Sequence, residues 1–229
     1  YAEAQNQLGV MYSSGQGVTQ DKTEAVKWFR QAAEQGHAKG QANLGAMYLN
    51  GAGVNQDYAE AVKWLCKAAE QGEVLAQSTL GVLYANGYGV TKDYTEAAKW
   101  YYKAAKQGYA QAQYNLGVMY ESGEGISKDY VEAAEWYYKA AEQGNAGGQY
   151  KLGLIYEWGQ GVPQDYAEAV RWYRKAAEQG DAGGQFKLGI MYELGQGVPQ
   201  DDAEAMKWYR KAAEQGNTSA KQRLKSFTN

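Results

Sequence analysis

The sequence repeats itself every 36 residues, and this period constrains the fold more than any other feature. Six tryptophans follow one another at this spacing: Trp28, Trp64, Trp100, Trp136, Trp172 and Trp208. A fixed period between about 20 and 50 residues is typical of stacked repeats, in which each repeat is one supersecondary unit. We therefore expect a single repeat domain over 1–229. Its repeats are predicted at about 1–36, 37–72, 73–108, 109–144, 145–180 and 181–216, followed by a capping helix over 217–229.

The second repeat shows how each unit is expected to fold. Leu44, Met47 and Tyr48 have the three- and four-residue spacing of one helix side, which predicts a first helix over about 38–50. The segment 51–56 contains two glycines, which favour tight turning, so it predicts a loop. Each repeat is therefore expected to begin as a helix followed by a loop.

A second helix is predicted to begin after Asp57. Asp57 and Glu60 have the spacing of a capping box, in which the Asp side chain accepts from the N–H of residue 60 and the Glu side chain accepts from the Asp N–H. Gly72 is expected to end this helix in the left-handed conformation. A glycine inside a helix, such as Gly45, costs ~1 kcal/mol relative to alanine. Its recurrence predicts that two helices approach too closely there for a Cβ atom.

Charge and hydropathy disfavour two classes of partner. The formal charge is -3, and Lys and Glu are interleaved along the chain, so nothing attracts nucleic acid or an anionic membrane. No apolar run approaches the roughly 18 residues of a membrane span, so we expect no direct membrane insertion. The first residue is Tyr1 and no polar end comparable to the C-terminal one precedes it, so we expect further repeats upstream.

The repeat resembles the Sel-one-like repeat, a relative of the tetratricopeptide repeat. Residues 150–180 show the pattern almost complete, with Leu152-Gly153, Tyr156, Gly159-Gln160-Gly161-Val162, Asp165, Glu168-Ala169, Trp172-Tyr173, Lys175-Ala176-Ala177 and Gln179-Gly180. The resemblance covers nearly the whole chain. It departs at Leu65 and Cys66, where an aromatic and a polar residue are usual, and at Lys225, where glycine is expected.

The resemblance implies an all-α fold, a right-handed α-solenoid of six helix-loop-helix repeats plus the C-terminal capping helix. It implies a concave surface, lined by the first helices, that holds peptides or folded proteins, and it implies no catalytic residue. Members of the family act as adaptors in membrane-protein quality control and as bacterial signalling or host-interaction factors. Periplasmic, secreted and cytoplasmic locations are all compatible with it. We expect a monomeric scaffold or adaptor, and the alternative is a structural spacer between other domains.

Residues that could carry chemistry are better explained by structure. His37 is expected to be a solvated turn residue, and Cys66 a tolerated substitution on a second helix. The Gly-x-Gly pairs lack the strand before and the helix N-terminus directly after that a phosphate-binding turn requires. Nearly every polar residue recurs with its repeat, whereas a catalytic centre needs unlike residues at one point. We therefore expect no enzyme, cofactor or metal.

Positions that vary between repeats are the candidates for recognition. In the last three repeats the first helices carry an aromatic row, Tyr114, Tyr150 and Phe186, beside a carboxylate row, Glu121, Glu157 and Glu193. Such a surface suits a peptide with apolar anchors and Lys or Arg. The equally weighted alternative is that the aromatics pack against the next repeat and the glutamates are solvated. Lys151 and Lys187 follow two of the aromatics and could neutralise part of the carboxylate row.

Overall fold

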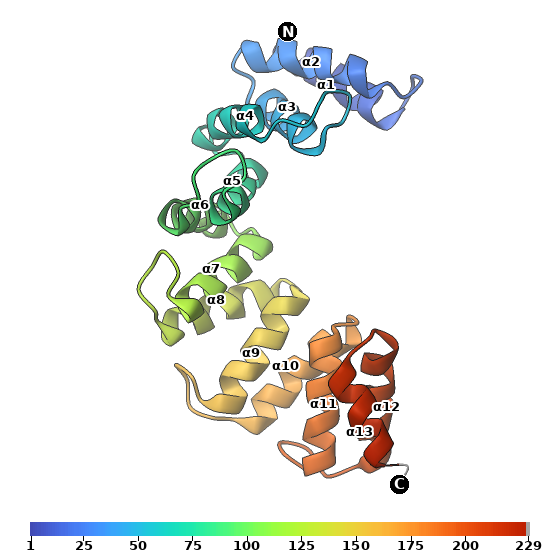
Figure 1. Cartoon of the computed structure of the whole chain (residues 1–229). Helices are drawn as coiled ribbons and strands as arrows, with labels where there is room; N and C mark the ends of the chain where they lie inside the picture. The colour runs from blue at the N-terminus through green and yellow to red at the C-terminus, as the bar shows by residue number, and fades with distance from the viewer. Residues whose placement is uncertain (228–229) are drawn as a thin grey trace. The chain divides into compact units, whose positions relative to one another are not determined.

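The computed structural model describes residues 1–227, in which there are thirteen α-helices and no strand. The first helices of the six repeats are α1 (Ala2–Ser14), α3 (Ala38–Asn50), α5 (Val74–Asn86), α7 (Ala110–Ser122), α9 (Ala146–Trp158) and α11 (Ala182–Leu194) (Figure 1). The second helices are α2 (Lys22–Glu34), α4 (Tyr58–Glu70), α6 (Tyr94–Lys106), α8 (Tyr130–Glu142), α10 (Tyr166–Glu178) and α12 (Asp202–Glu214). A last helix, α13, spans Thr218–Ser226. The end of the predicted capping segment, 228–229, lies outside the described residues.

The helices stack as in a solenoid. The two helices of a repeat pack side by side, as α9 and α10 do, and a second helix packs against the first helix of the next repeat, as α10 and α11 do. The chain divides into two compact units: an N-terminal unit of residues 1–112 with 124–126, and a C-terminal unit of residues 113–123 with 127 onward. The prediction of a single domain over 1–229 stays a prediction.

The N-terminus of each second helix has the predicted aspartate cap but not the predicted reciprocal bond. In α10, the Asp165 side chain accepts from the N–H groups of Ala167 at 2.9 Å and Glu168 at 3.0 Å, as expected. The Asp165 N–H, however, donates to the carbonyl of Tyr156 at 2.9 Å, and Glu168 pairs with Arg171 at 3.2 Å. The capping-box prediction is therefore wrong in its second half, because the preceding helix already supplies the acceptor.

Glycine is required where two helices of one repeat cross. A Cβ atom on Gly153 of α9 would lie 2.5 Å from the ring of Tyr173 on α10, which confirms the predicted close approach. Gly180, with φ +90°, follows Gln179 at the end of α10 and turns the chain into the next repeat, as the pattern predicts. Both glycines set the geometry on which the next repeat stacks.

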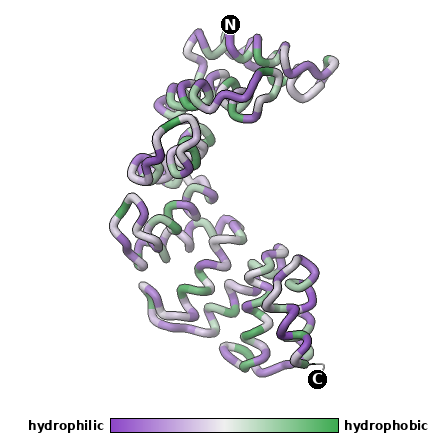
Figure 2. Tube along the Cα trace, viewed as in Figure 1, coloured by the Kyte–Doolittle hydropathy of each residue, from purple (hydrophilic) through white to green (hydrophobic). Residues whose placement is uncertain are grey.

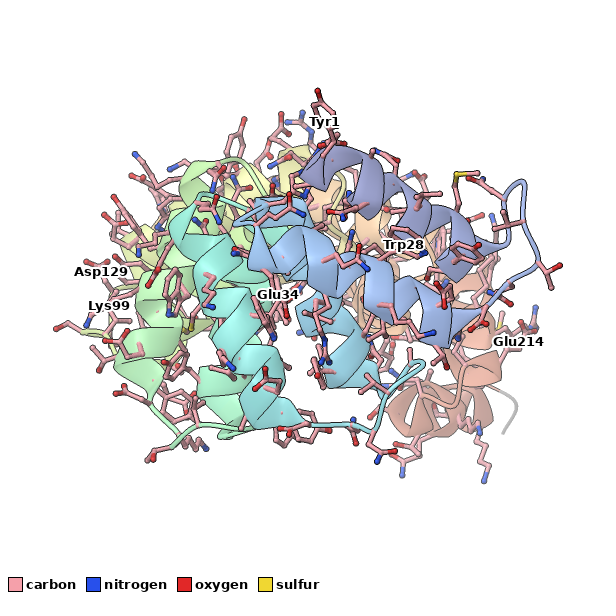
Figure 3. The ribbon with its side chains drawn as sticks, turned by 90° about the horizontal axis from the view of Figure 1, so that it is seen from above. Tyr1, Trp28, Glu34, Lys99, Asp129 and Glu214 are labelled. Atoms are coloured by element: carbon pink, nitrogen blue, oxygen red, sulfur yellow. The ribbon has the colours of Figure 1, made fainter. Side chains whose placement is uncertain are left out.

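The periodic tryptophans fill the space between repeats. Trp172 is 2% exposed and packs among Leu152 and Ile155 of its own repeat and Tyr137 of the preceding repeat. Each helix carries both buried apolar residues and exposed polar ones, so hydrophobic and hydrophilic residues are interspersed along it (Figure 2). Charged side chains such as Lys99 extend away from the helices into solvent (Figure 3).

Helix α13 covers the end of the last repeat. Ala220 is fully buried, and Leu224 and Phe227 pack on the cluster around Tyr209, with the Phe227 and Tyr209 ring centroids 6.3 Å apart. Lys221 and Lys225 are exposed on the opposite side. The predicted capping role of this helix is confirmed for the residues that the structure describes.

Candidate functional site

The six residues predicted to bind a partner all lie on α7, α9 and α11 of the C-terminal unit. They form three equivalent sets, one to a repeat, in which each first helix contributes an aromatic residue and, seven residues later, a glutamate. The members of each set contact other repeats as well as their own. Their surroundings therefore decide how much of each side chain is available to a ligand.

The aromatic row is partly buried between consecutive repeats. A Cβ atom on Gly147 would lie 3.1 Å from the ring of Tyr114, so the absence of a side chain on α9 makes room for that ring. The Tyr114 ring also lies against Tyr137, with centroids 5.9 Å apart. Tyr150 repeats this arrangement over Gly183 and beside Tyr173, at 3.1 Å and 6.0 Å. These rings contribute to packing and are only partly exposed.

Phe186 ends the aromatic row under α13. Its ring centroid lies 5.7 Å from that of Tyr209, and it belongs to the apolar cluster that Leu224 and Phe227 complete. All three aromatics thus occupy the same place in their repeats, with one edge toward the next repeat. The aromatic half of the packing alternative describes these contacts, and part of each ring stays exposed, whereas its expectation of simply solvated glutamates is wrong, because all three carboxylates are paired within the chain.

The carboxylate row is engaged within the chain. Glu157 accepts a hydrogen bond from the Tyr173 hydroxyl and forms an ion pair of 2.9 Å with Lys187 of the next repeat. Glu121 accepts from Tyr137 and pairs with Lys151 at 2.8 Å. In the last set, Glu193 accepts from Tyr209 and pairs with Arg223 at 2.8 Å. The predicted neutralisation by Lys151 and Lys187 is therefore confirmed.

Each phenol in these sets is held in its neutral form. Burial raises the pKa of Tyr173 well above its usual value, and the hydrogen bond to the Glu157 carboxylate raises this pKa further. The pKa values of Tyr137 and Tyr209 are raised by the same two causes in the same order. The phenols act as hydrogen-bond donors to a carboxylate that also has a cation partner. This arrangement ties consecutive repeats together.

The first three repeats lack this set. The glutamate position holds Ser13, Leu49 and Ala85, and the aromatic position holds Asn6, Ala42 and Ser78. The cation position holds Asn43, Thr79 and Asn115. All three positions change together between the two halves of the sequence, which indicates that their side chains form one interacting set.

Two exposed apolar residues extend the candidate surface, and the sequence reasoning missed them. Trp158 and Leu194 end α9 and α11 and are 52% and 55% exposed. Trp158 lies four residues beyond Leu154 and eight beyond Tyr150, so all three lie on one helix side. The signal was available, because this position reads Ser14, Asn50, Asn86 and Ser122 in the first four repeats.

Lys187 links the exposed tryptophan to the carboxylate row. Its ammonium nitrogen lies 5.4 Å from the centroid of the Trp158 ring while it pairs with Glu157. A cation over an aromatic face is attracted to the ring, by about 0.5–1 kcal/mol at exposed sites. Trp158 is therefore oriented by a residue of the next repeat.

His37 and Cys66 have structural roles in the N-terminal unit. His37 caps α3, since its Nδ1 atom accepts from the Gly40 N–H at 3.0 Å, and its Nε2 atom lies 2.8 Å from Glu3. The prediction of a plain solvated turn residue is therefore wrong for His37. Cys66 is partly buried, and burial raises the pKa of its thiol. A raised thiol pKa lowers the fraction of reactive thiolate, in agreement with a tolerated substitution.

Neither a metal site nor a membrane-spanning helix is present in residues 1–227. The described residues contain no cluster of three or more His, Cys, Asp or Glu side chains suited to a metal ion. Within the same range, no helix is long and apolar enough to cross a membrane.

The Gly-x-Gly pairs have positive φ, as at Gly159 (+66°) and Gly161 (+76°), and form the turn between two helices.

Comparison with known proteins identifies the repeat. The profile of the Sel1 repeat matches six consecutive segments, at residues 2–37, 38–73, 74–109, 110–145, 146–181 and 182–217. No curated protein matches the chain in sequence. These segments begin one residue after the repeats predicted from the tryptophan spacing.

Solved structures share the fold. A protective antigen present in uropathogenic Escherichia coli strains, displaying an SLR fold, is 43% identical over 98% of this chain, with a TM-score of 0.94. This chain covers 48% of that antigen, about half its length. A Sel1 repeat protein from Oxalobacter formigenes is 37% identical over 93% of this chain and 85% of its own, with a TM-score of 0.81. An immunity protein from Pseudomonas aeruginosa is 23% identical over 93% of this chain and 81% of its own, with a TM-score of 0.52, a likeness of fold alone.

Proposed function

Because the chain belongs to the Sel1 repeat family, a family of non-catalytic helical scaffolds that generally take part in protein interactions, we propose that it binds an apolar segment of a partner protein. The proposed surface is the first-helix face of the C-terminal unit. We define this face by Tyr114 and Val118 on α7, Tyr150 and Trp158 on α9, and Phe186, Ile190 and Leu194 on α11.

The exposure of Trp158 and Leu194 carries the proposal. Two large apolar side chains, each more than half exposed on successive first helices, offer apolar surface that a partner can cover. Tryptophan is also among the residue types that contribute most to protein interfaces, because it buries a large area with few rotatable bonds. The first four repeats place Ser or Asn at this position, so the fold itself does not require an apolar residue there.

The two predicted rows take different roles on this face. Tyr114, Tyr150 and Phe186 offer the partly exposed part of their rings as its floor. Glu121, Glu157 and Glu193 hold the helices in register through their phenol and cation partners and present the rest of their carboxylates to the partner. Since each glutamate is already paired with Lys or Arg, apolar anchors contribute more to recognition than basic ones.

The test compares peptide binding by matched variants. Wild-type protein is used to select binders from a displayed library of random peptides, and the affinities of the selected peptides are then measured. In the variant Trp158→Ser with Leu194→Asn, both positions take residues that the first four repeats carry, so the fold is retained. The control Leu75→Ser removes an apolar residue of comparable exposure, 59%, from α5 in the N-terminal unit.

We expect the double variant to lose at least about 30-fold in affinity, the loss typical of a hot-spot residue. The control is expected to bind as the wild type does. Equal binding by the double variant would contradict the assignment of this face. If the wild type selects no peptide at all, the alternative of a structural spacer is favoured.

A further inference from the structure

A cavity of the C-terminal unit lies between α8, α9 and the loop that follows α9. Its volume is about 330 Å³, and its lining includes Val131, Glu135, Tyr138, Leu152, Tyr156 and Val162. Val131 is 53% and Tyr138 48% exposed at its rim. We call this cavity the α8–α9 groove. None of its lining residues belongs to the first-helix face. The two surfaces share only helix α9, from which they use different residues.

An equivalent groove in the N-terminal unit differs in charge at two of its lining positions. It lies three repeats earlier, has a volume of about 410 Å³, and is lined by Thr23, Val26, Lys27, Arg30 and Val54 among others. Lys27 takes the place of Glu135, and Arg30 takes the place of Tyr138. The fold therefore builds the same groove twice. In the N-terminal groove these two positions are cationic and Glu34 also lines the groove, whereas in the α8–α9 groove they are a carboxylate and a phenol and Lys139 also lines the groove.

Glu135 is a charge reversal at a position that is otherwise basic. The other repeats carry Lys27, Lys63, Lys99, Arg171 and Lys207 there, and each pairs with the glutamate three residues before it. In α8 the residue three before Glu135 is Glu132, so two carboxylates lie one helical turn apart. The cation nearest to Glu135 is Lys139, at 3.9 Å. This part of α8 therefore has an excess of negative charge.

The chain itself shows which group the groove suits. In the first repeat, Arg30 donates to the hydroxyl of Tyr48, and its guanidinium carbon lies 5.9 Å from the centre of that ring. In the fifth repeat, Arg174 donates to the Tyr192 hydroxyl at 2.8 Å, with its guanidinium carbon 5.8 Å from the ring centre. A guanidinium on this tyrosine is thus a recurring contact of the fold.

Tyr156 is the tyrosine of the α8–α9 groove at the same position. Tyr138, not an arginine, faces it from α8, and within residues 1–227 no side chain hydrogen-bonds its hydroxyl. Burial raises the pKa of this hydroxyl, and the carboxylate of Glu168 raises that pKa further. The Arg171 cation lowers that pKa in part, and the hydroxyl stays neutral and able to accept a hydrogen bond.

We propose that the α8–α9 groove binds an arginine side chain of a partner protein. The guanidinium lies against the rings of Tyr138 and Tyr156, donates to the Tyr156 hydroxyl and pairs with Glu135. The aliphatic stem of the arginine packs on Val131, Leu152 and Val162. A planar guanidinium suits two aromatic rings better than a compact, strongly hydrated ammonium does.

The two cations near the groove have partners of their own. The ammonium of Lys139 lies 4.1 Å from the centre of the Trp136 ring as well as near Glu135. Arg171 pairs with Glu168 at 3.2 Å. The incoming guanidinium shares the Glu135 carboxylate with Lys139, whose ammonium lies 3.9 Å from it, near the upper limit for an ion pair. Glu132 adds a second negative charge on the same helix.

The test follows the valine methyl groups of the whole chain by NMR during titration with N-acetyl-arginine amide. Val131 and Val162 report on the α8–α9 groove, and Val54 reports on the equivalent groove as an internal control. Two further ligands complete the series: the citrulline analogue, which has the same shape without charge, and the lysine analogue. The variants Tyr138→Arg and Glu135→Lys carry residues that equivalent repeats already have, so each is expected to fold.

Saturable shifts are expected at Val131 and Val162 but not at Val54. Citrulline amide should bind roughly tenfold more weakly than the arginine compound. Both variants should lose the response, whereas Trp158→Ser with Leu194→Asn should keep it, so this site and the first-helix face are tested separately. The proposal is overturned if no shift occurs, if citrulline or lysine amide binds as well as the arginine compound, or if Val54 responds equally.

Discussion

The Nε2 atom of Gln179 donates to the Oε1 atom of Gln149 at 2.7 Å. Gln149, which is buried, in turn donates to the carbonyl of Ala141 at 3.1 Å. These two bonds connect the end of α10, the first turn of α9 and the end of α8 of the preceding repeat. The equivalent bonds recur at Gln41 with Gln71, Gln77 with Gln107, and Gln185 with Gln215. A buried glutamine thus fixes how each repeat stacks on the one before it.

Replacing Gln149 by Leu should destabilise the C-terminal unit by about 1–3 kcal/mol. Leucine fills a similar volume, but the buried Ala141 carbonyl loses its partner, and one unsatisfied buried group costs about that much, whereas the exposed Gln179 amide can bond to water. The measurement is the midpoint of urea unfolding followed by circular dichroism. The control is Gln222→Leu on the exposed side of α13, which should change the midpoint little. Equal midpoints for the two variants would contradict this role of Gln149.

Replacing Tyr173 by Phe should cost about 1.5–3 kcal/mol at neutral pH, because it removes a hydrogen bond to the Glu157 carboxylate. The cost should shrink as the pH rises above about 10, the pKa of an unfolded tyrosine. The pKa of Tyr173 is raised in the folded state, so its contribution is complete below the unfolded pKa and is lost above it, when the unfolded phenol ionises.

Urea unfolding of wild type and of Tyr173→Phe across neutral and alkaline pH measures this difference. The exposed Tyr88 provides the control, since Tyr88→Phe removes a phenol of similar size without a buried hydrogen bond. A stability difference for Tyr173→Phe that stays constant through pH 10, or that grows, would rule out the proposed linkage.

The sequence predicts the helices of this fold well because their ends are encoded locally. The predicted first helix over 38–50 coincides with α3, and the aspartate caps and the glycine after each second helix are where the pattern places them. The second half of the capping box was wrong because the acceptor for the Asp165 N–H is the Tyr156 carbonyl, which belongs to the preceding helix. A local motif does not reveal an acceptor supplied by another element.

Contacts between repeats were harder to predict. Tyr173 meets Glu157 across 16 residues, and Lys187 meets the same glutamate across 30 residues, neither of which is the period of the repeat. The 36-residue period shows which positions are equivalent in different repeats. It does not predict which non-equivalent positions contact one another. In contrast, Trp158 and Glu135 differ visibly in the sequence from the residues at the equivalent positions of most other repeats. They could have been found by asking at every position which repeat differs.

Truncation of the two tryptophans of the fifth repeat should change the free energy of unfolding by very different amounts. Trp172→Ala removes a side chain that is 2% exposed, and we expect a loss of about 3–5 kcal/mol. Trp158→Ala removes one that is 52% exposed, and we expect a change within about 0.5 kcal/mol. Trp136, which is 6% exposed, should behave like Trp172. Urea unfolding of the three variants measures these values. A large loss for Trp158→Ala would show that it supports the fold instead of facing a partner.

Gly153→Ala separates helix propensity from packing, because the two predict changes of opposite sign. Alanine stabilises a helix interior by ~1 kcal/mol relative to glycine, so propensity alone predicts a more stable protein. The new Cβ atom, however, would lie 2.5 Å from the ring of Tyr173, which is fully buried and cannot move aside without disturbing its bond to Glu157.

We therefore expect Gly153→Ala to destabilise the C-terminal unit by about 1–3 kcal/mol, the usual cost of overpacking a filled core. The matched control is Gly147→Ala on the same helix, where the Cβ atom would lie 3.1 Å from the edge of the partly exposed Tyr114 ring. That ring has room to shift, so the gain in helix propensity should offset most of the contact. If urea unfolding shows that Gly153→Ala is as stable as wild type or more so, the close approach of α9 and α10 does not explain why this glycine recurs.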